Sequence, residues 1–444
     1  MKKNFYIKTW GCQMNEYDTE LIEKQLTNDG YVKTKNQEKA DIFILNTCSI
    51  REKAQEKVFH QLGRWKKIKQ KKPNTIIAVG GCVATQEGER IYQRANYVSI
   101  IFGTQSLHKL SKMIRESYSS NNLIMDISFN KFKKFKIQKK VKKTKKKISS
   151  FVSIMEGCNN YCSFCIVPFT RGKEISRPVT HILSEIEKLS ENGVREINLL
   201  GQNVNSYLGI GKYNKLYKFS ELLLLVSEIN GIDRIRFTTS NPFQFTDDII
   251  NAYAKTKKIV NFLHLPIQSG SNKILRKMKR LHTVQEYKEI INKLKNVRNN
   301  IQISSDFIVG FPGETEADFL ETIKLIKEIK FDMSFSFIYS KRPGTPASKM
   351  KDFTSVEEKK ERLYFLQKII NKQTLYWSKK MLNQEKIILV EKESEKKDFN
   401  LMGKTENNRN VFFNGENKLI GNFTKVKITD FSAYNLYGKI IQNK

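Results

Sequence analysis

From residue 151 onward, the chain alternates between short apolar runs and segments with helical spacing of apolar residues. The pattern predicts strands at 151–155, 196–200, 234–238, 261–265, 301–309 and 333–339, separated by helices at 182–191, 220–229, 246–254, 283–295 and 316–329. Buried strands with helical crossovers form parallel sheets covered by helices. Six such repeats predict a partial (β/α)6 barrel, in which an active site lies at the carboxyl ends of the strands.

Three cysteines, Cys158, Cys162 and Cys165, follow the first of these predicted strands. A structural zinc site needs four protein ligands, and so does a ferredoxin-type iron–sulfur cluster. Three thiolates leave one metal atom open to another ligand, which indicates a site of chemistry. Two other interpretations remain: unrelated buried cysteines, or a zinc knuckle completed by a distant histidine, of which His181 is the nearest along the chain.

The N-terminal part has the same strand and helix alternation. Strands are predicted at 5–10, 41–47, 75–79 and 97–102, with helices at 16–28, 51–71 and 107–116, so we expect an open parallel α/β sheet with helices on both faces. Cys12, Cys48 and Cys82 each come just after a predicted strand. Because the carboxyl ends of parallel strands share one edge, these cysteines should meet there. The alternative is three unrelated buried cysteines, since free cysteine is often buried.

The end of the chain has a different pattern. After a helix predicted at 356–380, short strand-like runs at 385–390, 401–403, 411–413, 425–430 and 436–441 indicate a small all-β domain. A block of like charge at 131–147 is typical of a solvated linker, which could also contact phosphates. We therefore predict four segments: an N-terminal domain (1–120), a Lys-rich linker (121–148), the barrel (149–376) and the all-β domain (377–444).

The formal net charge is +34, from 79 basic and 45 acidic residues. Such an excess favours a polyanionic partner such as nucleic acid. Lys, Asn and Ile are all abundant, however, and drift in an AT-rich genome would also raise the lysine count. The chain has no apolar run long enough to cross a bilayer and no apolar signal core at its start. We expect a cytoplasmic protein without membrane contact, and few cysteines for its length argue against disulfides.

The spacing CxxxCxxC resembles that of the radical S-adenosylmethionine (SAM) enzymes. The longer stretch at 155–172, followed by Ser-Arg-Pro at 176–178, resembles the methylthiotransferase branch of that superfamily. The segments 9–15, 46–51 and 80–82, which contain the other three cysteines, match the motifs of the same branch. The all-β end resembles the TRAM domain, an RNA-binding β-barrel.

This resemblance implies two [4Fe–4S] clusters and SAM as cofactors. Cys158, Cys162 and Cys165 would hold the cluster that binds SAM and generates a 5′-deoxyadenosyl radical, while Cys12, Cys48 and Cys82 would hold an auxiliary cluster that gives up sulfur. The implied reaction converts N6-dimethylallyladenosine at position 37 of tRNA to its 2-methylthio derivative, with two SAM per turnover. The implied partners are a tRNA anticodon stem-loop and a reductant such as flavodoxin or ferredoxin, and we expect a monomer.

Polar residues at the predicted strand ends are candidate SAM or substrate contacts. Gln202 and Asn203 follow the second strand, Gln268 follows the fourth, Asp306 lies in the fifth, and Arg342 follows the sixth. Such residues orient ligands by hydrogen bonds, although turns favour similar residue types for backbone reasons. His264, near the same edge, could be a core histidine with its hydrogen bonds satisfied.

Related activities remain as alternatives. Enzymes with the same two-cluster layout methylthiolate an aspartate of a ribosomal protein, or threonylcarbamoyl-adenosine in tRNA, and the segment after Cys165 argues against both. A non-catalytic iron–sulfur carrier or electron-transfer protein would be a different class, and it would not cleave SAM.

Overall fold

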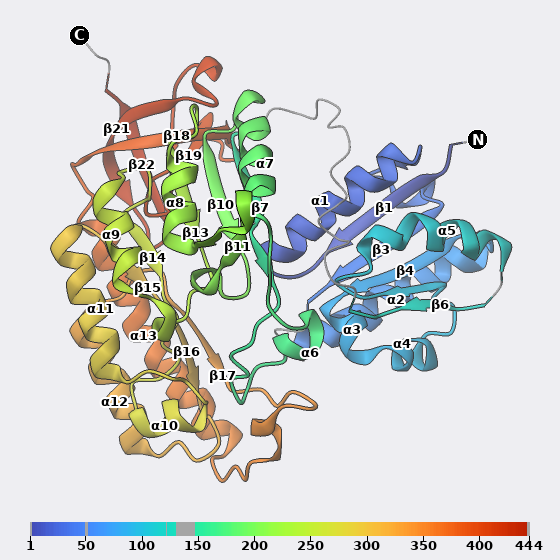
Figure 1. Ribbon diagram of the computed structural model, residues 1–444, viewed down its shortest axis with the longest axis horizontal. Helices are drawn as coiled ribbons and strands as arrows, with labels where there is room; N and C mark the ends of the chain where they lie inside the picture. The colour runs from blue at the N-terminus through green and yellow to red at the C-terminus, as the bar shows by residue number, and fades with distance from the viewer. Residues whose placement is uncertain (1, 49–51, 121, 130–146, 442–444) are drawn as a thin grey trace.

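The N-terminal part is a parallel six-stranded sheet with the strand order β2-β1-β3-β4-β5-β6. The computed structural model describes residues 2–48, 52–120, 122–129 and 147–441 (Figure 1). The strands of this sheet are β1 (Asn4–Thr9), β2 (Val32–Lys33), β3 (Ile42–Thr47), β4 (Ile76–Gly81), β5 (Ile100–Phe102) and β6 (Ile124–Asp126). The helices are α1 (Gln13–Asn28), α2 (Glu52–Lys71), α3 (Cys82–Glu87), α4 (Glu89–Arg94) and α5 (Leu110–Ser119).

Both faces of this sheet are buried, as the uninterrupted apolar strands predicted. Phe43 and Leu45 of β3 pack in one hydrophobic cluster with Trp65 of α2, whereas Ile42 and Ile44 pack in another on the opposite face. Side chains alternate between faces along a strand, so a strand covered on both sides must be apolar throughout. The strand β6 lies within 121–148, which the sequence assigned to a linker, and residues 130–146 of that segment lie outside the described residues.

The central part is an open barrel of parallel strands with helices outside it. Its strands are β7 (Ser149–Ser153), β10 (Glu196–Leu200), β13 (Arg234–Phe237), β14 (Phe262–His264), β15 (Gln302–Ser304), β16 (Asp306–Val309) and β17 (Phe335–Ile338). Its covering helices are α7 (Val179–Glu191), α8 (Phe219–Ser227), α9 (Asp247–Lys255), α11 (Val284–Val297), α12 (Glu316–Ile329) and α13 (Val356–Lys379). The strands form the sets β7-β10-β13, β14-β15 and β16-β17, and single bridges at Ile235–Ile259 and Gln268–Phe307 connect these sets.

The single strand predicted at 301–309 is wrong, because the structure divides it into β15 and β16 at Ser305. β15 pairs with β14, whereas β16 pairs with β17. The Ser305 amide donates to Ser334 Oγ (2.9 Å), and its hydroxyl accepts from the Ile267 amide (3.0 Å). The Ser305 carbonyl still accepts from the Phe335 amide of β17 (2.9 Å), so side-chain hydrogen bonds mark the residue at which the strand changes its partner. The apolar pattern could not show this change.

Several short elements around the barrel had no sequence prediction. They are β8 (Met155–Glu156), β9 (Ile175–Ser176), α6 (Val167–Arg171), the hairpin β11 (Leu208–Ile210) and β12 (Leu216–Lys218), and α10 (Asn272–Lys277). Elements this short carry too little periodicity to be recognised from sequence. Among the described residues, no helix is long and apolar enough to span a membrane.

The C-terminal part is a closed five-stranded barrel, which confirms the predicted all-β domain. Its strands are β18 (Glu385–Glu393), β19 (Leu401–Lys404), β20 (Asn410–Phe413), β21 (Phe423–Phe431) and β22 (Asn435–Ile440), in the order β18-β19-β20-β22-β21. Val411, Phe413 and Leu436 are among its fully buried core residues. Figure 1 shows this barrel beside the amino-terminal ends of the central strands β10 and β13.

The loop between β19 and β20 joins the two barrels through buried arginines. Arg236 of β13 donates to the carbonyl oxygens of Glu406 (2.6 Å) and Thr405 (2.9 Å). Arg409 is fully buried and forms a bidentate pair with Asp332, which precedes β17, at 2.6 and 2.7 Å. Bidentate charge-assisted pairs fix geometry as well as adding energy, so this junction holds the C-terminal barrel in one orientation.

Arg409→Lys should loosen this junction. Lysine keeps the charge but cannot reproduce the planar fork, nor the additional bonds that Arg409 donates to Ser378 Oγ (2.8 Å) and the Thr374 carbonyl (3.1 Å). We expect the free energy of unfolding to fall by about 2 kcal/mol. Urea denaturation followed by the fluorescence of Trp377, in a variant lacking the other tryptophans, measures this change. Lys293→Met, which breaks an exposed pair with Asp247, is the control and should cost less than about 0.5 kcal/mol.

Candidate functional site

Cys12, Cys48 and Cys82 meet at the carboxyl edge of the N-terminal sheet, as predicted. They follow β1, β3 and β4, which are neighbours in the sheet. The Cys48 side chain makes hydrogen bonds with both Cys12 and Cys82, so the three sulfur atoms form one group. Cys48 and Cys82 are buried, and Cys12 is partly exposed.

Two buried asparagines and a glycine hold the loops that carry these cysteines. Asn15 donates to the Thr47 carbonyl (3.0 Å), and Asn46 donates to the Asn15 carbonyl (2.9 Å), so the loops after β1 and β3 are tied together. Gly81, directly before Cys82, has a φ of +90°, and a Cβ there would lie 2.3 Å from the Thr47 carbonyl oxygen. Only glycine fits that turn.

The environment of this group favours thiolates at two of its three cysteines. The hydrogen bond from Cys48 lowers the pKa of Cys12 to about 6 and that of Cys82 to about 7, and the nearby Arg171 guanidinium adds to both effects. The same hydrogen bonds raise the pKa of the Cys48 thiol, because that group acts as the donor. Since the thiolate is the form that binds metals, the donor set suits an iron–sulfur cluster.

Cys158, Cys162 and Cys165 lie in the loop that follows β8. Gly157 has a φ of +84° and its amide donates to Gln202 Oε1 (2.6 Å), while the Cys158 amide donates to the Gly172 carbonyl (3.1 Å). Burial raises the pKa of Cys158 to about 11 and that of Cys165 to about 12. These pKa values describe thiols, and the positive ions of a cluster would displace their protons.

Arg280, from the loop after α10, contacts the same cysteine group. Its Nη1 lies 3.7 Å from Cys162 Sγ, and its Nη2 donates to the Pro266 carbonyl (2.8 Å). Ser163 is also tied to this region through its amide, which donates to the Met278 carbonyl (3.0 Å). The loop with the three cysteines is thus supported by a segment more than a hundred residues later in the chain.

Arg171 connects the N-terminal domain to β8, the strand that directly precedes the barrel cysteine loop. It is 2% exposed, and it donates to Asp18 Oδ2 of α1 (3.0 Å) and to Glu156 Oε1 of β8 (2.9 Å). Its charge also attracts Cys12 and Cys82, which raises its own pKa against the effect of burial. A buried guanidinium therefore balances two carboxylates and the thiolates of the N-terminal group.

Further hydrogen bonds place the N-terminal group against the mouth of the barrel. Gln105 Nε2 donates to the Arg171 carbonyl (2.9 Å), and Thr104 Oγ1 donates to the Thr170 carbonyl (3.0 Å). Gln13, next to Cys12, accepts from Thr238 Oγ1 just after β13 (3.3 Å). The carboxyl edge of the sheet thus faces the carboxyl ends of the barrel strands, and Figure 1 shows α3 beside α6 at this junction.

Gln202 and Asn203 lie at the end of β10, where the sequence predicted ligand contacts. The Gln202 side chain supports the cysteine loop through Gly157. Asn203 is 1% exposed; its amide nitrogen donates to Gln244 Oε1, while its Oδ1 has no hydrogen-bond partner among the described residues. A buried oxygen without a donor is a natural acceptor for a bound ligand.

Gln268 and Asp306 lie side by side at the ends of neighbouring strands. The Gln268 amide donates to the Asp306 carbonyl (3.0 Å), and Gln268 has a φ of +80°, in the left-handed region. Thr239, after β13, and Tyr161, in the cysteine loop, also have positive φ values. Such strained residues cluster at functional sites.

The remaining predicted residues lie in ordinary surroundings. His264 has Ser304 Oγ 3.0 Å from its Nδ1 and Asp306 Oδ2 3.4 Å from its Nε2, as expected of a histidine with its hydrogen bonds satisfied. Arg342 is buried after β17, and its carbonyl accepts from Thr345 Oγ1 (2.8 Å). His181 is exposed on α7. In the described ranges, no group of three or more His, Cys, Asp or Glu residues is arranged to hold a single metal ion.

Sequence reasoning missed the charged residues that surround the cysteines, namely Asp18, Glu156, Arg171 and Arg280. One signal was available, since Glu156 and Arg171 lie in the segment that carries the family resemblance. Nothing in the sequence connects either of them to Asp18 of α1.

Comparisons with known proteins agree with this architecture. Residues 4–103 match an uncharacterized protein family (UPF0004), residues 152–326 match the radical SAM superfamily, and residues 379–441 match the TRAM domain. In fold, the chain is similar to the radical SAM methyltransferase TsrM from Kitasatospora setae, with a TM-score of 0.55 and 12% identity over 78% of this chain and 77% of that one. These matches define a radical SAM protein with a TRAM domain, a class that uses a [4Fe–4S] cluster and SAM.

Much nearer relatives share almost the whole chain. The tRNA-2-methylthio-N(6)-dimethylallyladenosine synthase of Buchnera aphidicola subsp. Schizaphis graminum is 63% identical over 99% of this chain and 100% of its own length. The enzyme of the same name from Histophilus somni is 56% identical over 100% of this chain and 94% of its own. The chain belongs to the family of tRNA-2-methylthio-N(6)-dimethylallyladenosine synthases.

Proposed function

We propose that this protein converts N6-dimethylallyladenosine at position 37 of tRNA to 2-methylthio-N6-dimethylallyladenosine, with two SAM per turnover. The observation that supports this most strongly is the junction at Arg171. One buried guanidinium joins α1, which begins directly after Cys12, to β8, which directly precedes the loop with the barrel cysteines, and its charge also acts on Cys12 and Cys82. A reaction that needs a radical and a sulfur atom at the same carbon requires such proximity.

Cys158, Cys162 and Cys165 would hold the [4Fe–4S] cluster that binds SAM, and Cys12, Cys48 and Cys82 would hold the auxiliary cluster. When bound, these groups supply a 5′-deoxyadenosyl radical and a transferable sulfur. The C2–H bond of adenine is unactivated, so proton transfer by a side chain could not readily open it, and a radical route makes physical sense.

The protein's own residues position the reactants and exclude water. Among the described residues, no donor reaches the buried Asn203 Oδ1 just after β10, and Gln268, after β14, is joined by a backbone hydrogen bond to Asp306, the first residue of β16. These residues would orient SAM or the adenine by hydrogen bonds. Arg342 is a further candidate on the loop after β17. A base in an RNA loop can be splayed out of its stack into such a pocket, which suits the anticodon loop as substrate.

Nucleoside analysis tests the assignment. tRNA from cells that lack the gene should contain N6-dimethylallyladenosine without its 2-methylthio derivative, and expression of the gene should restore the derivative. Mass spectrometry of digested tRNA measures both nucleosides. If the methylthio nucleoside persists unchanged in the deletion strain, the assignment is wrong. If the purified, reconstituted protein modified a ribosomal-protein aspartate but not tRNA, the substrate would be the protein instead.

A further inference from the structure

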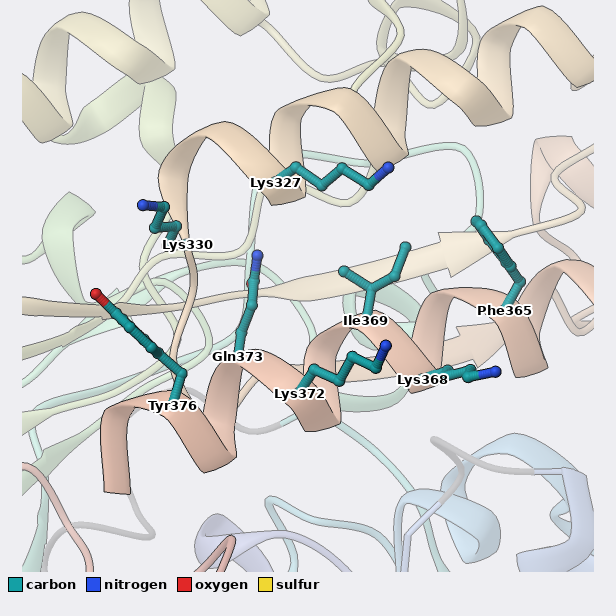
Figure 2. Close-up of a pocket in the computed structure, with 8 residues that line it drawn as sticks. All are labelled: Lys327, Lys330, Phe365, Lys368, Ile369, Lys372, Gln373 and Tyr376. Atoms are coloured by element: carbon teal, nitrogen blue, oxygen red, sulfur yellow. The ribbon is translucent and has the colours of Figure 1, made fainter. Parts of the chain in front are cut away.

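A groove on the outer surface of the barrel, between α12 and α13, is lined by lysines and by aromatic side chains. It encloses about 520 Å³, and four of its eight lining side chains are lysines (Figure 2). The lining residues are Lys327, Lys330, Phe365, Lys368, Ile369, Lys372, Gln373 and Tyr376. Figure 2 shows the lysines projecting along both sides of the groove, with Phe365 and Tyr376 at its two ends.

The positive charge of this groove is locally unbalanced. The segment 363–384, which includes most of the lining of the groove, contains no acidic residue, whereas the whole chain has 45 acidic to 79 basic residues. On the α12 side, Glu328 is the nearest carboxylate along the chain, and it pairs with Lys288 of α11 at 2.6 Å. Compositional drift in the genome would raise the number of lysines along the whole chain, but it would not remove carboxylates from the lining of one groove. Binding of a polyanionic partner explains both features of this lining.

The aromatic residues in and beside the groove are unusually exposed. Tyr364 is 71% exposed, Phe365 46% and Tyr376 42%. Lys380 lies over the rings of Tyr376 and Trp377, at 5.0 and 5.2 Å from their centroids. Basic residues interleaved with exposed rings are typical of nucleic-acid surfaces, where lysines meet phosphates and rings meet bases or sugars.

The position of the groove separates it from the reaction site. The first turns of α13 lie at the mouth of the barrel, where Arg362 pairs with Glu314 (3.1 Å) in the loop after β16. Its last two turns lie at the other end of the barrel, where Thr374 and Ser378 contact Arg409 of the C-terminal domain. From Arg362 to Tyr376 the helix rises about 20 Å, so the groove extends well away from the mouth.

We propose that this groove binds the phosphate backbone of the tRNA beyond its anticodon loop. The inference rests on the proposed function for the identity of the RNA. An RNA whose loop enters the mouth is long enough to reach the groove. An acidic reductant is a poorer candidate occupant, because it must approach the cysteines at the mouth to deliver electrons. The exposed rings and the lysines would together hold the stem without reading its sequence.

The test uses the full-length reconstituted protein and compares Lys368→Gln/Lys372→Gln with Lys255→Gln/Lys257→Gln. The control pair removes the same charge from exposed residues at the end of α9. Binding is measured by fluorescence anisotropy, over a range of salt, with full-length tRNA and with a short hairpin of the anticodon loop. The groove variant should bind the full tRNA about tenfold more weakly, with a slope of log K against log salt reduced by about 1 to 2.

The short hairpin separates this inference from the proposed function. The groove variant should bind and methylthiolate the hairpin as the unmodified protein does, because the mouth is unchanged. The inference would be overturned if the groove and control variants lost equal affinity for the tRNA, or if the groove variant bound the tRNA as tightly as the unmodified protein does. It would also be overturned if the groove variant lost equal affinity for the tRNA and for the hairpin. Normal tRNA binding with slower reduction by flavodoxin would also overturn it, and would assign the groove to a protein partner. If the unmodified protein does not methylthiolate either RNA, the proposed function itself fails.

Discussion

Cys48→Ala is expected to abolish the methylthio product while keeping part of the SAM cleavage, whereas Cys162→Ala is expected to abolish both. The reason is the separation of the two cysteine groups. Cys48 makes hydrogen bonds with Cys12 and Cys82 in the N-terminal sheet, and Cys162 lies in the barrel loop beside Arg280. A group that has lost one of three ligands should no longer hold its cluster, while the other group keeps all of its ligands.

The measurement is an anaerobic assay that quantifies 5′-deoxyadenosine and the methylthio nucleoside in the same reaction. Iron analysis after reconstitution is the control that does not depend on activity. The unmodified protein should carry about eight irons per chain and each variant about four, as expected for two [4Fe–4S] clusters of which one is lost. Equal loss of SAM cleavage in both variants would refute the division into a radical site and a sulfur site.

The meeting of Cys12, Cys48 and Cys82 was predictable because it follows from a simple property of parallel sheets. Apolar runs identified the strands, and all carboxyl ends of a parallel sheet lie on one edge whatever the strand order. In the structure β1, β3 and β4 are adjacent in the sheet, so the three cysteines follow neighbouring strands. The barrel and the C-terminal all-β domain followed from periodicity in the same way.

The contacts between domains were not predictable, because they depend on pairs of residues far apart in sequence. Arg171 and Asp18 are 153 positions apart, and Arg409 and Asp332 are 77 apart. Each is a buried charge that needs its partner, but no local pattern indicates which partner that is. The break at Ser305 was hidden for a related reason, since hydrogen bonds from Ile267 and to Ser334 end the strand there, and an apolar pattern does not record them.

Arg171→Met is expected to have the largest effect of any single change at the junction between the domains. It would remove the guanidinium that pairs with both Asp18 and Glu156, in a site where Arg171 is only 2% exposed. Removing one partner from a buried ionic group costs about 3 to 5 kcal/mol. The substitution should also weaken iron binding by the N-terminal cysteines, because the charge of Arg171 helps to stabilise thiolates at Cys12 and Cys82.

Urea denaturation and iron content after reconstitution measure these two effects separately. Arg94→Met, which breaks an exposed pair with Glu56 in the N-terminal domain, is the control and should cost less than about 1 kcal/mol. Adding Asp18→Asn and Glu156→Gln to Arg171→Met removes the two carboxylate charges that Arg171 balanced, so the triple variant should regain stability but not the lost iron. An Arg171→Met protein as stable as the Arg94→Met protein, and with full iron content, would show that the guanidinium supports neither the junction between the domains nor the N-terminal cysteines.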